Sequence, residues 1–376
     1  MEETIIIRHH LHTIAELSGG EQITHNVIVH CLKKCNATHI HTNVGGYGVV
    51  AAWIVGTDCT TIALRCDIDA LPITETLDVD YKSVNKGVSH KCGHDGHTAI
   101  LLNLAKMLSC KKLAVNVVLI FQPEEETGMG ADKILRSKVL EQYNIDVIYG
   151  FHNLPHYDMG CVVLKKDTFA AASVGVGISL EGRATHAAHP ENGINPANAI
   201  AEIILMMNKY NVLNTDYHLF KQSTLIYTNI GKKAFGTSPG EAEIMFTLRA
   251  FSNKNMDELK QYLFDTVNDI SKKYNLATSM KLYEPFAAVE NNNEVVDTIE
   301  QTALQMDMPI YWLDTPFRWS EDFAEYLKHY KGAFLGIGAG VDCLELHHPQ
   351  YDFPDEIITT TSKLLYNIIV NTESLH

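Results

Sequence analysis

The chain has 376 residues, of which 46% are hydrophobic and 20% are charged, so we expect a folded protein of about two domains and exclude a disordered chain. Its formal charge of -15 comes from 30 Lys and Arg against 45 Asp and Glu, and it excludes a nucleic-acid partner because a polyanion would be repelled. No apolar stretch approaches the roughly 20 residues that cross a bilayer, so we expect no membrane association. The acidic start Met1-Glu2-Glu3 is unlike a secretion signal, and the expected location is the cytoplasm.

Cysteine and histidine are used differently along the chain. The 8 cysteines have no regular spacing and are expected to be reduced thiols. The 19 histidines are numerous, and many fall into a few short clusters. Because imidazole binds metals and moves protons, these clusters are the first candidates for a functional site.

The first part of the chain alternates predicted helices and strands. A link at 56–59 is predicted to be the turn of a hairpin, because it is short, contains Gly56 and joins two strand-like runs. This order favours a three-layer α/β domain. The predicted elements are helices at 2–15 and 20–36, strands at 48–55 and 61–66, a helix from Thr98, and buried strands at 115–121 and 146–151.

The middle of the chain has a different pattern. Its βαββαβ order is typical of a small ferredoxin-like module, with strands predicted at 174–180, 223–230, 242–251 and 280–283 and helices at 195–210 and 256–274. The α/β pattern resumes with a helix at 293–306, a strand at 332–337 and a helix at 356–371. We therefore predict a catalytic domain at 1–170 and 286–376, interrupted by an inserted domain at 171–285.

A Cys-x-His pair follows one of these predicted strands. Cys92 and His94 lie in the loop Lys91-Cys92-Gly93-His94-Asp95-Gly96-His97, directly before the helix predicted from Thr98. Thiolate and imidazole are good ligands for zinc and related metals, and open α/β sheets bind their ligands at such strand exits. The alternative is a polar loop in which Asp95 caps the helix.

Three consecutive carboxylates follow another predicted buried strand. Glu124, Glu125 and Glu126 would repel one another there, and a divalent cation would remove that repulsion. In an extended segment, neighbouring side chains point to opposite sides, so one carboxylate can bind metal while the next reaches a water molecule. A solvated acidic turn is the alternative.

Histidines follow two further predicted strands. His152 comes just after a buried strand, and His347 and His348 come after the glycine-rich exit at 336–340. Singly, each is more often a surface or core histidine than a ligand. In a sheet rich in parallel strands, however, the exits lie on one edge, so we expect these groups to converge.

Ordered motifs along nearly the whole chain resemble the amidohydrolase branch of the co-catalytic metallopeptidase family. This family contains N-acyl-amino-acid deacylases, auxin-conjugate hydrolases and N-acetyldiaminopimelate deacetylases. The motifs are Arg8-His9-His10-Leu11-His12 with Glu16, Asp67-Ile68-Asp69-Ala70-Leu71-Pro72, Cys92 to Thr98, Phe121-Gln122-Pro123 with Glu125-Glu126, His152, Gly182 to His186-Ala187-Ala188 with Pro190, Ser320-Glu321-Asp322-Phe323, and Leu346-His347 with Pro349. The resemblance implies a zinc-exopeptidase-like catalytic domain with an inserted α+β lid and dimerisation domain.

The resemblance also implies a role for each site residue. Two divalent ions, of zinc, manganese, cobalt or nickel, would be held by a set of five ligands with Cys92 as the bridge: Cys92, His94, Glu126, His152 and His347. Glu125 would be the general base, and His186 of the inserted domain would stabilise the oxyanion, often in a partner subunit. Asp67, Asp69 and Asp95 would orient imidazoles, since a ligating histidine usually donates its second N–H to an acceptor.

The sequence departs from the family pattern at several positions. Glu124 stands where a small residue is usual, Asn195 stands where Asp is common, and 236–239 replaces a stretch that helps to bind substrate in relatives. Arg249 remains a candidate for binding a substrate carboxylate through a two-pronged ion pair, and a surface strand charge is its alternative. These departures affect the substrate more than the metal chemistry.

The function that the resemblance implies is hydrolysis of the amide bond of N-acyl amino acids, for example N-acetyl amino acids, by a metal-dependent homodimer. The alternative within hydrolases is an exopeptidase acting on dipeptides. A thiol nucleophile formed by Cys92 with His94 or His97 is a different mechanism, and a non-catalytic metal-binding protein is a third hypothesis.

Overall fold

The computed structural model describes residues 2–212 and 217–373, and the chain divides into two compact units. The first unit consists of Met1–Phe169, Glu290–Asp314 and Asp322–His376, and the second of Ala170–Val289 and Thr315–Glu321. The α/β fold class expected from the sequence is confirmed, and the two units differ in the kind of sheet that they contain. Among the described residues, no helix is both long and apolar enough to cross a membrane.

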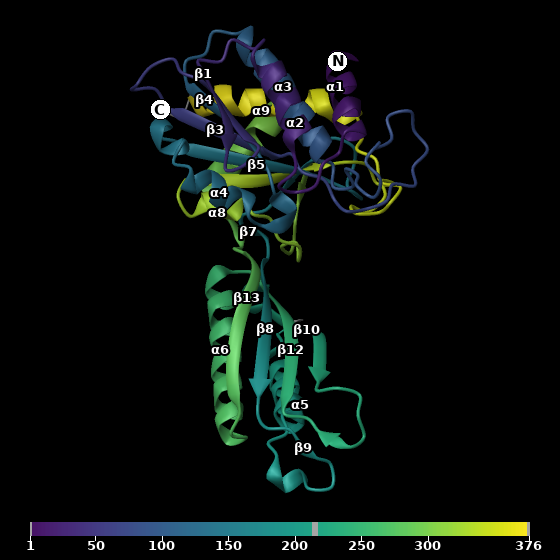
Figure 1. Ribbon diagram of the computed structural model, residues 1–376. Helices are drawn as coiled ribbons and strands as arrows, with labels where there is room; N and C mark the ends of the chain where they lie inside the picture. The colour runs from purple at the N-terminus through teal and green to yellow at the C-terminus, as the bar shows by residue number, and fades with distance from the viewer. Residues whose placement is uncertain (1, 213–216, 374–376) are drawn as a thin grey trace. The chain divides into compact units, whose positions relative to one another are not determined.

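The first unit is built on one mixed sheet with helices on both faces (Figure 1). The strands lie in the spatial order β1 (His39–Val44), β2 (Gly48–Trp53), β4 (Asn116–Gln122), β3 (Thr61–Asp67), β5 (Val147–Leu154), β16 (Gly332–Gly338), β6 (Val162–Leu164) and β15 (Ile310–Trp312). β3 runs parallel to β4 and β5, and β5 runs parallel to β16. Every residue of β3, β4, β5 and β16 is buried, as expected for central strands of a sheet covered on both sides.

Four helices pack their apolar residues against one face of this sheet: α2 (Gln22–Leu32), α3 (His94–Ser109), α7 (Asn293–Gln305) and α9 (Glu356–Glu373). α1 (Glu2–Thr13) packs against α3, whereas the short helices α4 (Gly130–Arg136) and α8 (Ala324–Leu327) lie on the opposite side of the sheet (Figure 1). The first unit also contains two 3₁₀ turns, η1 (Glu125–Thr127) and η2 (Leu140–Tyr143). Two short paired strands lie where the chain leaves this unit and returns to it, β7 (Asp167–Ala170) and β14 (Val289–Asn291).

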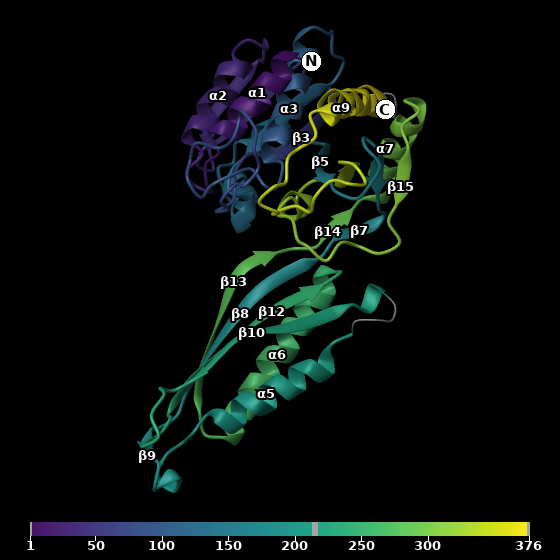
Figure 2. The ribbon, with the colours of Figure 1, turned by 90° about the vertical axis from the view of Figure 1, so that its right-hand side faces the viewer.

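The second unit has a four-stranded antiparallel sheet covered on one face by two helices (Figure 2). The strands lie in the order β10 (Lys221–Ile230), β12 (Glu241–Ala250), β8 (Ala172–Glu181) and β13 (Ala277–Phe286), and the helices are α5 (Ala197–Tyr210) and α6 (Asn253–Lys273). The segments between these strands and helices contain a short strand pair, β9 (Thr185–His186) and β11 (Thr237–Ser238). They also contain two 3₁₀ turns, η3 (Pro190–Asn192) and η4 (Tyr217–Leu219). The βαββαβ order with this arrangement is that of a ferredoxin-like module.

Alternation along the sequence explains the core of the second unit. In β8, Val174, Val176, Ile178 and Leu180 are buried and face the helices, as expected for a sheet with one covered face. The helix α6 begins where the Ser252 hydroxyl accepts a hydrogen bond from the Asn255 amide at 3.1 Å.

The link at 56–59 is not a hairpin turn, so this prediction was wrong. β2 and β3 are not neighbours, because β4 lies between them and pairs with both. The sequence prediction also missed β1, whose residues are mostly polar and only partly buried. The first difference arises because strand pairing can involve segments that are distant in the sequence, as β4 is from β2 and β3. β1 pairs with its neighbour in the chain, β2, and was missed because its residues do not form an apolar run.

Helix α3 begins at His94, four residues before the predicted start. Its first turn carries polar side chains that are nevertheless fully buried. The spacing of apolar residues, which indicates the rest of the helix, therefore does not indicate this turn. Gly93 precedes the helix with φ +90°, and a Cβ atom there would lie 2.5 Å from the Asn153 amide oxygen. A Cβ at Gly96 would lie 2.4 Å from the Phe353 ring. Glycine at these two positions therefore allows the start of α3 to approach β5 and the C-terminal segment closely.

Candidate metal centre

The predicted site residues of the first unit come from the ends of parallel strands. Asp67 ends β3, Gln122 ends β4, and His152 lies near the end of β5. Because these strands are parallel, their carboxyl ends share one edge of the sheet. The loop that carries Cys92 leads into α3 at this edge.

Several metal-binding side chains converge there. The ligand atoms of Cys92, Glu126 and His347 lie within 4.8 Å of one another, and so do those of His94, Glu125 and Glu126. Glu126 belongs to both groups, and its Oε1 lies 3.9 Å from Nε2 of His94 and 3.9 Å from Nε2 of His347. Cys92 Sγ lies 3.4 Å from Nε2 of His152. One sulfur, three imidazoles and two carboxylates thus share a small volume.

Two polar atoms of this cluster make it a candidate cation site. Nε2 of His94 and Oε1 of Glu126 are buried, and among the described residues neither atom has a hydrogen-bond partner. Such atoms are rare in folded proteins because desolvation without a partner is costly. A cation between them would satisfy both, so the donor set fits a metal ion.

The pKa values of these groups agree with a missing positive charge. Burial raises the pKa of Glu126 to about 7, and the negative charge of Asp69 adds to the effect. Burial and the nearby Glu126 and Glu125 raise the pKa of the Cys92 thiol well above its usual value. For His94, burial lowers the pKa, but Asp67 and Asp69 outweigh burial and raise it to about 10. Without a cation, this cluster therefore retains protons that a metal would displace.

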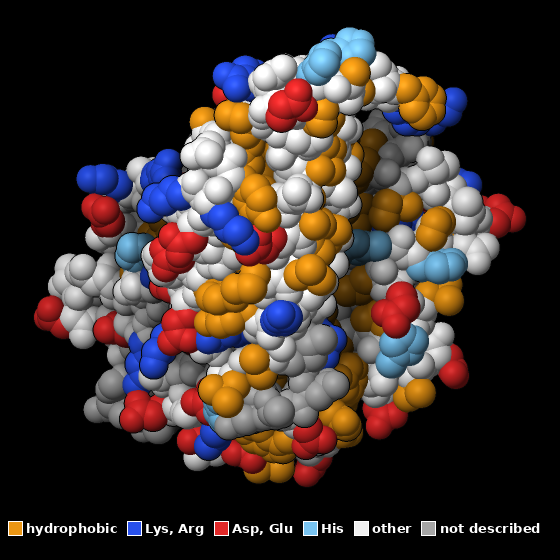
Figure 3. Space-filling view, turned by 90° about the horizontal axis from the view of Figure 1, so that it is seen from below, with side chains coloured by type: hydrophobic (Ala, Val, Ile, Leu, Met, Phe, Trp, Pro, Cys, Tyr) orange, Lys and Arg blue, Asp and Glu red, His pale blue; other side chains and the backbone are white. Residues whose placement is uncertain are grey.

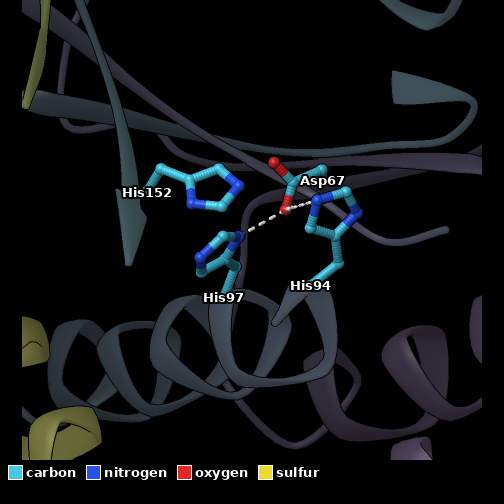
Figure 4. Close-up of side chains that lie close together, drawn as sticks. All are labelled: Asp67, His94, His97 and His152. Carbon is cyan, nitrogen blue, oxygen red and sulfur yellow. Dashed lines mark hydrogen bonds and ion pairs between the residues drawn. The ribbon is translucent and has the colours of Figure 1, made fainter. Parts of the chain in front are cut away.

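A third group of potential ligands lies beside the first two and is shown in Figure 4. It consists of Asp67, His94, His97 and His152, all buried. Oδ1 of Asp67 lies 2.6 Å from Nδ1 of His97 and 3.8 Å from Nε2 of His94. Nε2 of His97 lies 2.6 Å from the Asn153 side-chain oxygen. With both ring nitrogens engaged, His97 is a support for Asp67 rather than a ligand.

Asp69 connects the two segments that carry His94 and Glu126. Its backbone oxygen and Oδ1 lie 3.0 and 3.2 Å from Nδ1 of His94, which leaves Nε2 directed at the cluster. Its Oδ2 accepts the Glu126 amide at 3.0 Å and the Ser18 hydroxyl at 2.7 Å. The carboxylate therefore fixes the orientation of one imidazole and the start of the acidic turn.

The acidic turn differs from the extended segment that we expected. Glu125 and Glu126 lie in the 3₁₀ turn η1, and Glu124 before it has φ +56°. Both side chains approach His94, so the prediction that neighbours point to opposite sides was wrong because the chain is not extended. The third carboxylate, Glu124, is bound by the Lys133 ammonium at 2.6 and 2.7 Å and adds no unbalanced charge to the site.

Asp95 is in contact with an imidazole, but not with one of the five proposed ligands. Its Oδ2 lies 2.8 Å from Nδ1 of His12 and 3.0 Å from Nε of Arg8, both on α1. Of the three aspartates expected to orient ligands, only Asp69 is hydrogen-bonded to one, namely His94. Asp67 acts through His97 instead.

The remaining two predicted site residues belong to the second unit. His186 is exposed on β9, where its Nδ1 accepts a hydrogen bond from the Ala188 amide at 3.0 Å. Arg249 lies on β12 and donates from Nη1 to the Arg318 carbonyl at 2.6 Å and to the Ser320 hydroxyl at 3.3 Å. Their catalytic roles stay predictions.

A buried arginine that is hydrogen-bonded to Asp67 was not singled out from the sequence. Arg65, in the middle of β3, donates to the side chains of Gln122, Asp67 and Asp322, each at 2.8 Å. It compensates two buried carboxylates and ties together the ends of β3 and β4. The signal in the sequence was an arginine inside the otherwise apolar run of residues 61–66.

Comparisons with known proteins agree with this site. Residues 63–371 match the family described as peptidase family M20/M25/M40. The chain is 32% identical over 369 residues to an N-acetyl-L-cysteine deacetylase of Bacillus subtilis, with 97% of this chain and 87% of the relative covered. It is 29% identical over 377 residues to an uncharacterised hydrolase of Staphylococcus aureus, with 97% of this chain and 96% of the relative covered.

A solved structure has the same fold. A dinuclear metal-binding peptidase of the M20 family from Bacillus subtilis superimposes with a TM-score of 0.86 and 26% identity, and the match covers 99% of this chain and 98% of that one. Because the family match extends over most of the chain and includes the strand-edge site, the chain belongs to peptidase family M20/M25/M40 and is a hydrolase of amide C–N bonds.

Proposed function

We propose that this chain is a two-metal amidohydrolase that removes the acyl group from N-acyl amino acids. The observation that carries the proposal is the convergence of sulfur, imidazole and carboxylate donors around two buried atoms without partners, Nε2 of His94 and Oε1 of Glu126. The relative of Bacillus subtilis named for N-acetyl-L-cysteine supports the substrate class, and the dinuclear peptidase supports two ions.

The proposed ligands are Cys92, His94, Glu126, His152 and His347. Cys92 is the proposed bridge, because its sulfur lies near His152 as well as in the group formed with Glu126 and His347. This mixture of soft and intermediate donors accepts zinc, manganese, cobalt or nickel. When bound, two such ions would polarise the amide carbonyl and lower the pKa of a water molecule toward about 7.

Glu125 is the proposed general base. Its side chain is buried and belongs to the same group as His94 and Glu126, so it would be placed to take a proton from a water molecule held there. The same carboxyl group would later deliver the proton to the departing amine. Proton transfer of this kind typically contributes about 10²–10⁴-fold to the rate.

The inserted domain is proposed to supply substrate contacts. Arg249 would bind the substrate carboxylate, and its guanidinium is held in place by the Arg318 carbonyl and the Ser320 hydroxyl. His186 would stabilise the oxyanion, as the resemblance implies. Closure of this domain over the substrate would exclude water.

The inserted domain is also the proposed dimer contact. β10 is an edge strand of its sheet, and Leu225, Ile226 and Tyr227 on it are 39%, 60% and 45% exposed. On α5, Leu205 and Met206 are 61% and 37% exposed. Hydrophobic side chains at the surface are visible in orange in Figure 3. An exposed apolar edge of this kind is normally covered by a partner.

The thiol-nucleophile alternative is disfavoured by the surroundings of Cys92. A reactive cysteine needs a lowered pKa. Here burial and two glutamates raise the pKa of the thiol instead. A metal ion, by contrast, would stabilise the thiolate directly.

The test is an activity screen of metal-stripped and reconstituted enzyme. N-acetyl, N-formyl and longer N-acyl amino acids are assayed beside dipeptides, with zinc, manganese, cobalt and nickel added separately. We expect hydrolysis of N-acyl amino acids that a chelator abolishes and metal restores. A preference for dipeptides would replace the proposed substrate class, and full activity in the presence of chelator, with a stable acyl-enzyme detected by mass, would reject the metal mechanism.

A further inference from the structure

Lys91 is a buried charged residue next to Cys92 that the mechanism does not use. Its side chain is 0% exposed. The ammonium forms an ion pair with Glu75 and donates to the Tyr351 carbonyl at 2.7 Å. The Lys91 carbonyl accepts the His347 amide at 2.7 Å. One residue thus binds the 347–351 segment at two points, once through its main chain and once through its side chain.

The ion partner of Lys91 is itself fixed on the opposite side. Glu75 lies 2.9 Å from Nε2 of His12 and accepts the Ser83 amide at 2.9 Å. Burial raises the pKa of Glu75, but the hydrogen bonds from His12 and Lys91 outweigh burial and lower it to about 2. Nδ1 of the same His12 ring lies 2.8 Å from Asp95, which adjoins His94.

The network alternates basic and acidic side chains. Arg8, His12 and Lys91 face the carboxylates of Glu75, Asp95, Asp352 and Asp355. Apart from Asp352 and Asp355, whose side chains are 28% and 23% exposed, these groups are buried. A buried network with several ion pairs and hydrogen bonds is a rigid support, and the loss of one member leaves its partner uncompensated.

His347 needs such a support more than the other proposed ligands do. Its side chain is 53% exposed, and its backbone has φ +68°, a conformation that non-glycine residues rarely adopt. Packing therefore does little to hold the imidazole. The bond from its amide to Lys91 and the bond from Lys91 to Tyr351 attach this segment to the Cys92 loop.

We propose that Lys91 is a positioning residue that sets the spacing between Cys92 and His347, so that both can bind the same metal ion. The inference rests on the proposed metal function, because it concerns two of the proposed ligands. Lys91 does not touch substrate or metal in this scheme. It acts through the segment that it fastens to the Cys92 loop.

Positioning and simple electrostatics predict opposite results for K91M. Removing a positive charge beside a cation site should strengthen metal binding, because a repulsion is lost. Loss of positioning should weaken it, by about 10–100-fold as for other groups that support metal ligands. The K133M variant is the matched control, since it removes a lysine ammonium from a different ion pair, the one with Glu124 beside the acidic turn.

The experiment is calorimetric titration of the metal-stripped full-length protein with zinc and with manganese. For wild type and K133M we expect two bound ions per chain. For K91M we expect one of the two affinities to fall about 10–100-fold. In the cobalt-loaded protein, the thiolate-to-cobalt absorption band should weaken or shift, which reports on the Cys92 ligand without using activity.

A double variant separates positioning from stability. K91M leaves Glu75 with an uncompensated charge and lowers the unfolding temperature, whereas K91M/E75Q removes both charges and should recover much of it. Metal affinity should stay low in the double variant, which also serves as the test if K91M alone does not fold. Two ions bound by either variant with wild-type affinity would overturn the inference. If wild type itself binds no metal, it is the proposed function that fails.

Discussion

Replacing Asp69 by asparagine tests how the protein prepares its metal site. The carboxylate is fully buried and makes three side-chain contacts: with His94 at 3.2 Å, the Glu126 amide at 3.0 Å and the Ser18 hydroxyl at 2.7 Å. An asparagine has one acceptor oxygen and one donor group. If its oxygen faces His94, its NH₂ group faces two donors. If it turns over, the imidazole loses the side-chain acceptor and keeps only the backbone oxygen of residue 69, which lies 3.0 Å from Nδ1.

The size of the effect follows from these contacts. A hydrogen bond to a charged acceptor contributes about 1.5–3 kcal/mol. Loss of one such bond from the bound conformation corresponds to about 10–100-fold in metal affinity, the range found for groups that orient metal ligands. The charge of Asp69 is also lost, and it is one of the two main causes of the raised pKa of His94.

Chelator competition on metal-stripped protein measures this affinity directly. The S18A variant is the control, because it removes the hydroxyl group that donates to Oδ2 of Asp69 and leaves the charge of Asp69 in place. We expect a smaller loss for S18A than for D69N, because in S18A the carboxylate keeps its charge and its contacts with His94 and the Glu126 amide. D69N activity should recover at saturating metal. Metal affinity of D69N within about twofold of wild type would refute the reasoning, since the predicted loss is at least about tenfold.

Four further outcomes are expected. E125Q should keep both ions but lose at least about 10²-fold in kcat, because it removes the base and not a ligand; substantial turnover at full metal content would reject that role. C92A should bind less than two metal equivalents by elemental analysis, and two full equivalents would show that the sulfur is not a ligand. Between about pH 7 and pH 9 the metal-stripped protein should lose stability as the pH rises, because the pKa of His94 is raised to about 10 and the folded chain keeps a proton that the unfolded chain releases. This range lies above the usual pKa of histidine, so the lowered pKa values of His90 and His152 do not oppose the effect there. Thermal unfolding between about pH 7 and pH 9 measures this slope, and a stability that rises with pH over this range would contradict it. I226E, on the exposed edge strand, should shift a dimer toward monomer in sedimentation experiments, whereas an unchanged dimer would place the contact elsewhere.

Four expectations stay predictions: the lid role of the inserted domain, the catalytic role of His186, carboxylate binding by Arg249 and the cytoplasmic location. The inserted module, predicted at 171–285, lies within a compact unit that comprises Ala170–Val289 and Thr315–Glu321. The additional stretch at 315–321 could not be predicted, because it is associated with that unit through tertiary contacts, among them the bridge between Ala170 and Phe317 and the bonds from Arg249 to Arg318 and Ser320.

The sequence by itself determined the fold class and the edge of the sheet at which the chemistry lies. Buried runs such as 115–121 and the alternating run 174–180 indicate strands through local periodicity, which depends only on the residues concerned. The rule that parallel strands end at one edge then predicted that the Cys92 loop, the acidic turn and His152 would meet. Local sequence patterns were sufficient for these conclusions, because each strand, and each side chain that follows it, is recognised within a short segment of the chain.

Only the tertiary structure decided how strands pair and how the ligands are supported. β4 lies between β2 and β3, and Lys91 reaches Glu75 and Tyr351, residues that are far from it in the sequence. A buried charge is tolerated only next to a partner of opposite charge, and here the partner lies on a different segment of the chain. Neither the spacing of apolar residues nor a local motif indicates which segment that is. The same holds for Arg65 and Asp322, and it explains why the groups that bear the chemistry were readable in the sequence while charged supports such as Lys91 and Arg65 were not.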